Sequence, residues 1–521
     1  MARGCLSVGV ATFLFCAGAS VVLGPPPPSI HDEFSYLLAG DTFAHGRLAN
    51  PTHPLWQHFE SFHVLPRPTY ASKYPPAPGV FLAVGQVLTG FPIVGVWLSL
   101  SLAGAAVFWM LRAWLPGGWS FLGAMLLMAS PLVALRWGDS YWGGGVPLLG
   151  GALVLGAAGR LCERRRLRDG ALLGLGLFLL AASRPYEGAL AAIPAVAAVA
   201  IQWWRQRRKG DVPWRRPALA FAAVACGGAA FMGYYNARVT GSPVTFPYLA
   251  YRAEYPSVPL LGAGPSQAPT AYRHRAFEAF QKAWVEPMHH TTRVAGDRWR
   301  LKLALVQAEV YRPFLGYSLT LPFLWSLGPP RRRAVHMALG ACLLVLAGNQ
   351  LYLWLFAHYF APAGAAVCLL FTLGLRRMMA FRRPLGTALT LAVLVFAVAE
   401  SHAGYRTEWG ESTSKRQNWA GTRVQWQRAL ELRPGPDLVM VRYDEGHSFH
   451  QEWVYNGADI DGAPVVWARE MDDESNRRLF DYFSERETWL LVSGATQATL
   501  DPYPAGTASE EAGPRDAGSR R

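Results

Sequence analysis

Two adjacent carboxylates, Asp32 and Glu33, follow closely on the first apolar segment, and Lys73 precedes the point where the chain becomes apolar again. Ionisable groups held at a membrane surface by flanking apolar segments are functional candidates. A carboxylate there can act as a general base that removes a proton from an attacking hydroxyl or amine. The plainer interpretation is an acid that caps a helix N-terminus. With the surrounding pattern, we favour catalysis by Asp32 and Glu33.

Cations at the ends of apolar segments could bind phosphate. Lys73 stands directly before Tyr74-Pro75-Pro76, and its point-charge ammonium suits a phosphate or pyrophosphate group. Taken alone, Lys73 would be interpreted as an interfacial lysine whose side chain extends out of the bilayer. Arg184 and His358 also lie at outer ends of apolar segments and could bind phosphate. The plainer roles are an ion pair for Arg184 and a hydrogen-bonded interfacial side chain for His358.

Other polar residues near the same ends are candidates for substrate contacts. Tyr186 and Glu187 follow Arg184, and Glu187 could simply pair with that arginine. Asp139 lies between two tryptophans in a short turn, where it could contact an acceptor or orient Lys73.

No metal or other cofactor is indicated, although a divalent metal stays an open alternative. The first polar loop is rich in histidine, but its spacing matches no metal-binding motif. These residues are His31, His45, His53, His58 and His63, together with Glu60. The six cysteines lie in or beside apolar segments, which favours neither a disulfide framework nor a cysteine-type zinc site.

The composition predicts a membrane protein. Of the 521 residues 51% are hydrophobic and only 16% are charged, against roughly 25% charged in soluble domains. Many apolar runs approach or exceed the roughly 18 residues that suggest a bilayer span. We therefore expect a mainly α polytopic bundle of about eleven spans. Their predicted bounds are 5–23, 91–114, 119–136, 143–162, 170–183, 188–204, 217–235, 316–328, 335–357, 361–375 and 384–400.

The net charge of +14 indicates topology rather than a nucleic-acid partner. Its arginines and lysines cluster in four blocks between apolar segments, as the positive-inside rule requires. The blocks are 164–168, 205–216, 331–333 and 376–383. With the N-terminus inside, all four fall on the cytoplasmic side of an inner membrane, and the candidate residues fall outside. A cleaved signal peptide is the alternative for the first segment.

The predicted domains follow from this topology. Residues 1–400 form the membrane domain, with outer segments at 24–77 and 236–315. Residues 401–504 form a small extracytoplasmic α/β domain, since three strand-like runs surround a helix near 472–484. The tail, 505–521, is expected to be disordered.

The chain resembles the GT-C superfamily of membrane glycosyltransferases. The motifs that carry the resemblance are Asp32-Glu33-x-x-Tyr36, Gly46 and Lys73-Tyr74-Pro75-Pro76. They follow the order of the branch that contains lipid A aminoarabinose transferase and the protein O-mannosyltransferases, with Tyr74 as a departure. Three runs also resemble a bacterial subgroup of this branch, namely 69–76, 183–187 and 452–461.

The resemblance implies a catalytic base at Asp32 and a donor-phosphate ligand at Lys73, with Arg184 and His358 as further phosphate contacts. It implies transfer of a sugar from a polyprenyl-phosphate donor to a glycan, lipid or protein acceptor, with inversion. The alternatives are a transporter or flippase for lipid-linked glycans and a non-catalytic envelope assembly protein. Transporters usually bind near the bilayer midplane, which disfavours the first.

Overall fold

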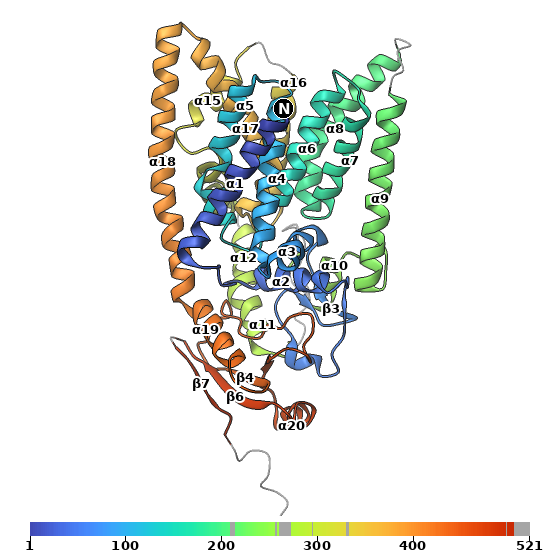
Figure 1. Cartoon of the computed structure of the whole chain (residues 1–521), viewed down its shortest axis with the longest axis vertical. Helices are drawn as coiled ribbons and strands as arrows, with labels where there is room; N and C mark the ends of the chain where they lie inside the picture. Colours follow the sequence, from blue (N-terminus) through green and yellow to red (C-terminus); the bar gives the residue numbers. More distant parts are fainter. Residues whose placement is uncertain are drawn as a thin grey trace, which may run out of the picture.

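The computed structural model describes residues 1–208, 214–255, 258–259, 272–293, 295–329, 333–495 and 497–504. The predicted tail at 505–521 lies outside the described residues. The chain is mainly helical, with a bundle above and a small sheet below it in Figure 1. The predicted class, a helical membrane bundle with a C-terminal α/β domain, is confirmed.

Seven of the described helices are long and apolar enough to cross a membrane. They are α1 (Ala2–Leu23), α4 (Pro92–Leu111), α8 (Pro185–Arg207), α9 (Arg215–Thr240), α16 (Arg333–Leu351), α17 (Ala357–Ala380) and α18 (Arg383–Gln417). Shorter helices pack among them, namely α3 (Pro76–Thr89), α5 (Gly117–Met128), α6 (Gly145–Leu161), α7 (Leu167–Ala181) and α15 (Thr320–Ser326). The chain is thus a multi-pass membrane protein.

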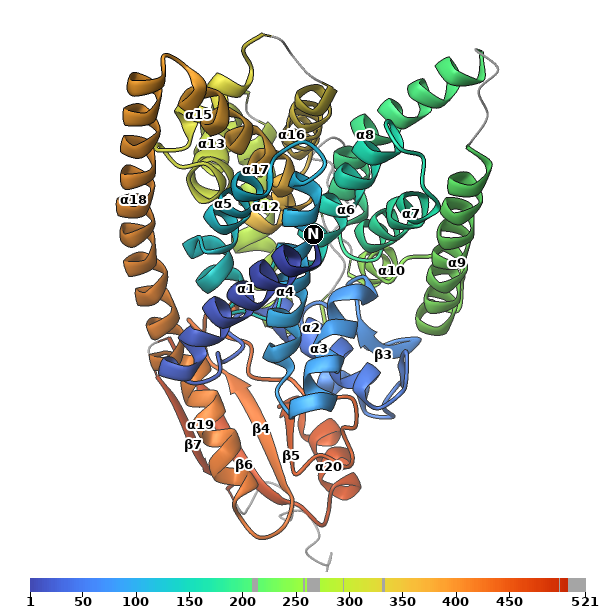
Figure 2. The ribbon, with the colours of Figure 1, turned by 45° about the horizontal axis from the view of Figure 1, so that its top comes forward.

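The bundle is centred on α17, whose most apolar stretch is buried throughout. Helices α18 and α9 lie at opposite sides of it (Figures 1 and 2). The predicted spans omit α3, which crosses α4 so closely that a Cβ on Gly95 would meet the Phe81 carbonyl at 1.8 Å. Only glycine permits this contact. The boundary predicted at residue 401 falls inside α18, which continues from the bundle towards the sheet.

The end of the bundle nearest the sheet is covered by short elements. The first loop forms α2 (His31–Ala44), η1 (Trp56–Phe59) and the strands β1 (Asn50–Pro51), β2 (Val64–Leu65) and β3 (Thr69–Ser72). The second polar segment is mostly helical among its described residues. It forms α10 (Pro247–Glu254), α11 (Arg275–Phe280), η3 (Gln281–Val285), α12 (Glu286–Arg293), α13 (Ala295–Leu305), η4 (Val306–Tyr311) and α14 (Arg312–Phe314). Elsewhere in the chain, the short π-helix η2 (Leu132–Trp137) precedes α6.

The C-terminal region is a four-stranded sheet with the order β5-β4-β6-β7, in which only β7 is antiparallel to its neighbour. Its elements are α19 (Trp419–Glu431), β4 (Asp437–Tyr443), β5 (Val465–Arg469), α20 (Asp473–Tyr482), β6 (Glu487–Ser493) and β7 (Ala498–Pro502). The three parallel strands are rich in valine and leucine, as expected of strands buried on both faces.

The sequence predicts the segment from Asp32 to His45 as an amphipathic helix on the membrane surface. The helix forms, but most of α2 is buried. The ring of Phe34 packs on Tyr455 at 4.7 Å, and the Asp41 carboxylate accepts a hydrogen bond from the Ala458 amide. The C-terminal region thus covers one face of α2, and α3 packs so closely on the helix that a Cβ on Gly40 would meet Leu82. The position of α2 at the membrane surface stays a prediction.

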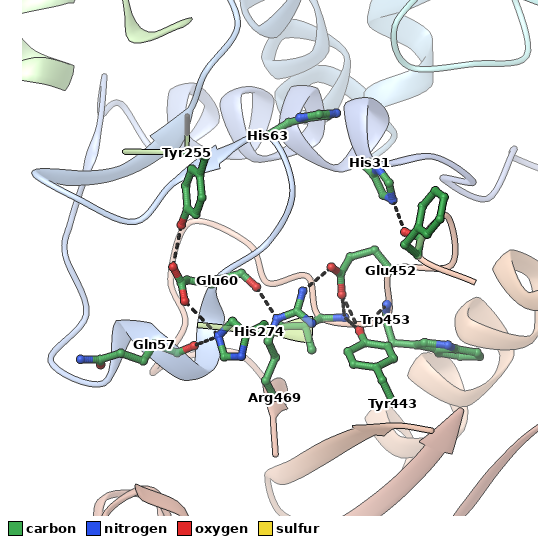
Figure 3. A network of polar contacts seen from close by, with 12 residues as sticks. His31, Gln57, Glu60, His63, Tyr255, His274, Tyr443, Glu452, Trp453 and Arg469 are labelled. Carbon is green, nitrogen blue, oxygen red and sulfur yellow. Dashed lines mark hydrogen bonds and ion pairs between the residues drawn. The ribbon is translucent and has the colours of Figure 1, made fainter. Parts of the chain in front are cut away.

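A buried polar network joins the first loop to the sheet (Figure 3). The Arg469 guanidinium, 2% exposed, donates to the Glu60 carbonyl oxygen at 2.7 Å and forms an ion pair with Glu452. Arg273 and His274 in turn contact the Glu60 carboxylate at 2.9 Å. Although burial opposes it, hydrogen bonds from His274 and neighbouring groups lower the pKa of Glu60. The network holds both segments in one arrangement.

Breaking this network should loosen the interface. We expect Glu452→Ala to cost about 3–5 kcal/mol, because it leaves the Arg469 cation buried without its partner. The matched control is Glu474→Ala, which removes an exposed pair with Arg478 and should cost under about 1 kcal/mol. Thermal unfolding of the purified variants in detergent measures both. Equal unfolding temperatures for the two variants would contradict the role given to Glu452.

Candidate active site

A cavity of about 390 Å³ lies where the first loop, the second polar segment and the C-terminal region meet the ends of the spanning helices. Three of the nine residues predicted as site residues line it, namely Asp32, Lys73 and Arg184. Aromatic rings form much of its wall. They belong to Phe62, Tyr74, Trp142, Tyr248, Tyr251, Tyr255, Tyr272, Phe277, Phe280, Trp284, Tyr352, Trp354, Phe356 and Tyr359.

The first turn of α2 separates the two adjacent carboxylates. Asp32 faces the cavity, and its Oδ1 accepts a short hydrogen bond from the Tyr74 hydroxyl. Glu33 is buried and does not line the cavity. It accepts hydrogen bonds from the amides of Ser29 at 2.8 Å and Tyr141 at 3.0 Å, and burial raises its pKa. Glu33 therefore fixes the start of α2 and so positions Asp32.

The β2–β3 hairpin positions Lys73. Because Val64 pairs with Ser72, the next residues along the two strands, His63 and Lys73, lie opposite each other. The Lys73 ammonium donates to His63 Nδ1 at 2.8 Å, and its Nζ lies 4.8 Å from the centre of the Tyr251 ring. Burial lowers the pKa of Lys73 to about 7, opposed by the nearby Asp32 carboxylate. Burial and the Lys73 charge hold the pKa of His63 well below its usual range.

Two guanidinium groups complete the charged part of the wall. Arg184 precedes α8, and its guanidinium lies 4.4 Å from the centre of the Tyr359 ring. None of the described residues accepts a hydrogen bond from that guanidinium. Arg252, in the last turn of α10, donates to the Val258 carbonyl oxygen at 2.7 Å. Among the described residues that line the cavity, Lys73, Arg184 and Arg252 are the cations, and Asp32 is the one carboxylate.

The other predicted site residues lie outside the cavity wall. Asp139 forms a buried ion pair with Arg416, 2.7 Å between Oδ1 and Nη2, so it ties the turn before α6 to α18. The Tyr186 hydroxyl donates to the Gly348 carbonyl oxygen at 3.0 Å. Glu187 is buried within α8. The contacts of Asp139 and Tyr186 hold elements of the bundle together, whereas the Glu187 charge acts on Arg184 in the cavity wall.

Tyr36 and His358 lie one layer behind the wall. The Tyr36 ring stacks on Tyr74 at 4.4 Å and so supports the hydroxyl that contacts Asp32. The His358 ring packs on Trp142 at 4.4 Å, and its Nε2 is buried without a hydrogen-bond partner among the described residues. A direct phosphate contact for His358 would need Trp142 or Phe356 to move.

Sequence reasoning missed several cavity residues. Arg252 and two tyrosines come from α10, a short helix inside the segment 236–315, for which the sequence predicts only a large outer polar segment. His450 reaches the cavity from the connection between β4 and β5, and the carbonyl oxygen of the preceding Phe449 accepts a 2.6 Å hydrogen bond from His31 Nε2. The local signal, three tyrosines and one arginine within 247–255, is visible in the sequence but does not show where these side chains lie in the fold.

The described residues contain no group of three or more histidine, cysteine or acidic side chains placed to hold a metal ion. The histidines of the first loop are spread over several contacts instead. His53 contacts Asp461, and His58 contacts the Arg469 carbonyl oxygen. The chemistry open to the site rests on one carboxylate and three cations.

No protein-family model and no curated protein matches the chain, but solved structures do. ArnT from Cupriavidus metallidurans bound to undecaprenyl phosphate is 12% identical, with a TM-score of 0.52 over 94% of this chain and 93% of that one. The apo form of the same protein is 13% identical, with a TM-score of 0.51 over 94% and 93% of the two chains. ArnT is a lipid A aminoarabinose transferase, a GT-C protein. At this identity the likeness concerns the fold, and the chain therefore has the GT-C fold.

Proposed function

We propose that the protein is a membrane glycosyltransferase that moves a sugar from a polyprenyl-phosphate donor to an acceptor. The observation that carries this proposal is the charge of the cavity, where Lys73, Arg184 and Arg252 face one carboxylate. Burying uncompensated cations is costly, so such a site favours an anionic ligand. The GT-C fold adds support, since the similar crystal structure of ArnT contains bound undecaprenyl phosphate.

The proposed reaction assigns each group a role. Asp32 accepts the proton of the acceptor hydroxyl as its oxygen attacks the anomeric carbon of the donor sugar. The bond between that carbon and the phosphate oxygen breaks, and its electron pair leaves with the polyprenyl phosphate. Lys73 and Arg184 stabilise the negative charge that develops on this leaving group. Attack from the face opposite the phosphate inverts the anomeric centre.

We place this chemistry on the outer face of the cytoplasmic membrane. The basic ends of α8, α9, α17 and α18 lie at the end of the bundle far from the sheet (Figure 1), which favours a cytoplasmic position for that end. The cavity and the C-terminal domain lie at the other end. A polyprenyl chain could then stay in the bilayer while its phosphate reaches Lys73, and a glycan, lipid or protein acceptor approaches from outside.

The position of the cavity also bears on the alternative of transport. Transporters bind substrate near the midplane between repeated halves. Here the charged residues gather at the ends of α8 and α17 and on extramembrane elements. This placement favours transfer at a surface over passage through the bundle.

The direct test is donor turnover. Purified protein in nanodiscs is given a panel of radiolabelled polyprenyl-phospho-sugars with candidate acceptors. We expect wild type to release sugar from one donor, and Asp32→Asn to be slower by about 10²–10⁴-fold because the base is lost. Asp481→Asn, at an exposed position on α20, is the matched control and should keep full turnover. Equal turnover by wild type and folded Asp32→Asn would rule Asp32 out as the base.

The pH dependence tests the role of Lys73. The donor is a phosphodiester whose charge does not change near neutral pH, so only the protein titrates. As pH rises through about 7, free enzyme loses the Lys73 proton, and kcat/KM for the donor should fall because the anion loses its cation. Lys73→Arg keeps its charge and should move this fall to higher pH. The control is Lys282→Arg at an exposed position, which should leave the pH profile unchanged. If kcat/KM of Lys73→Arg falls at the same pH as in wild type, the role given to Lys73 is contradicted.

A further inference from the structure

His63 is held in a backbone conformation that L-amino acids rarely adopt. Its φ is +65°. Two donors fix its carbonyl oxygen, the Ser35 hydroxyl at 2.6 Å and the Lys73 amide at 3.2 Å. Its own amide donates to the Tyr251 hydroxyl at 3.1 Å. A strained residue persists only where its surroundings hold it, and such residues cluster at functional sites.

The ring of His63 lies between two of the groups that the proposed reaction uses, Lys73 and Asp32. Its Nδ1 is 2.8 Å from Lys73 Nζ, and its Nε2 is 3.7 Å from Asp32 Oδ2. An ammonium can only donate hydrogen bonds, so Nδ1 must accept and the ring proton resides on Nε2. That proton faces Asp32. The separation is longer than a hydrogen bond, but catalytic hydrogen bonds are often long in empty sites and shorten when substrate binds.

We propose that His63 is a positioning residue that couples donor-phosphate binding at Lys73 to the orientation of the Asp32 carboxylate. This inference rests on the proposed function. A phosphate beside Lys73 keeps that side chain charged, which fixes the His63 ring proton on Nε2. The Nε2–H then holds Asp32 Oδ2, while the Tyr74 hydroxyl holds Oδ1.

Each carboxylate oxygen keeps a second lone pair when it accepts one hydrogen bond. With both oxygens held, the free lone pairs point in fixed directions, and one can meet the acceptor hydroxyl. When Lys73 loses its proton, nothing fixes the tautomer of His63, and the base loses one of its two supports. A bound donor phosphate, by keeping Lys73 charged, thus favours the arrangement in which the carboxylate is set for proton transfer.

A purely structural role for His63 is the competing explanation. The ring packs edge-on to Tyr74 and Tyr251, with centroids 6.1 Å and 6.0 Å apart. A side chain that only fills space would be replaced equally well by any ring of similar size. A coupling side chain needs one nitrogen that accepts from Lys73 and an N–H that donates to Asp32.

Chemical rescue separates the two explanations. His63→Gly suits the positive φ, because glycine adopts it without strain. We expect kcat to fall by about 10–100-fold, as for other side chains that orient a catalytic group, and KM for the donor to stay within about threefold. Added imidazole should restore much of kcat. 1-Methylimidazole should not, because it can accept from Lys73 but has no N–H for Asp32.

The controls isolate this inference from the proposed function. His45→Gly, at an exposed position, should keep its turnover, and neither imidazole should change it. A wild-type kcat in His63→Gly, or equal rescue by both imidazoles, overturns the coupling while leaving the transferase proposal intact. Wild-type turnover in folded Asp32→Asn rules Asp32 out as the base, whereas a wild-type protein that releases sugar from no donor in the panel overturns the transferase proposal.

A measurement on the intact protein covers the case in which His63→Gly does not fold. Histidine labelled with ¹⁵N distinguishes the two tautomers by NMR, and His63→Asn, which also tolerates positive φ, assigns the signal. With undecaprenyl phosphate bound, we expect the His63 proton on Nε2. A proton on Nδ1 in that complex would overturn the inference.

Discussion

The site depends on an excess of positive charge held in a cavity whose walls are largely aromatic. Lys73, Arg184 and Arg252 face a single carboxylate, and aromatic faces rather than acids surround them. Cation–π contacts offset part of the cost of desolvating these cations, but they add no negative charge. An anion that enters the cavity therefore meets groups already in place, and little reorganisation is needed to stabilise charge on it.

The scaffold that holds these charges comes from distant parts of the chain. The hairpin around β2 and β3 supplies Lys73 and His63, and the start of α2, fixed by Glu33, supplies Asp32. The C-terminal sheet supports the first loop, which contains this hairpin and the start of α2, through the hydrogen bond from Arg469 to the Glu60 carbonyl oxygen. The C-terminal region is therefore part of the site's support rather than a separate appendage, and His450 extends it into the cavity wall.

The fold class could be predicted because long apolar runs and basic blocks are properties of single chain segments, and these can be identified directly in the sequence. Asp32 and Lys73 could be found for the same reason, since each lies beside the end of an apolar segment. The pairing of His63 with Lys73 could not, because it depends on the register of a hairpin whose strands are only two and four residues long.

The contacts that the sequence could not show have the same origin. Asp139 has a membrane-end position like that of Lys73, but its partner is Arg416, 277 residues away. Nothing near Asp139 in the sequence indicates that contact. Helix α3 was missed because its 14 residues are too few to suggest a span. Arg252 was missed because its helix has only eight residues and lies inside the polar segment 236–315, which contains no apolar span.

The most direct test of the central claim is a cryo-EM structure of the protein with undecaprenyl phosphate in nanodiscs. The account predicts the phosphate within hydrogen-bond distance of Lys73 Nζ and the Arg184 guanidinium, on the same side of the cavity as Asp32. Density for the phosphate elsewhere on the protein, with this cavity unchanged, would contradict it.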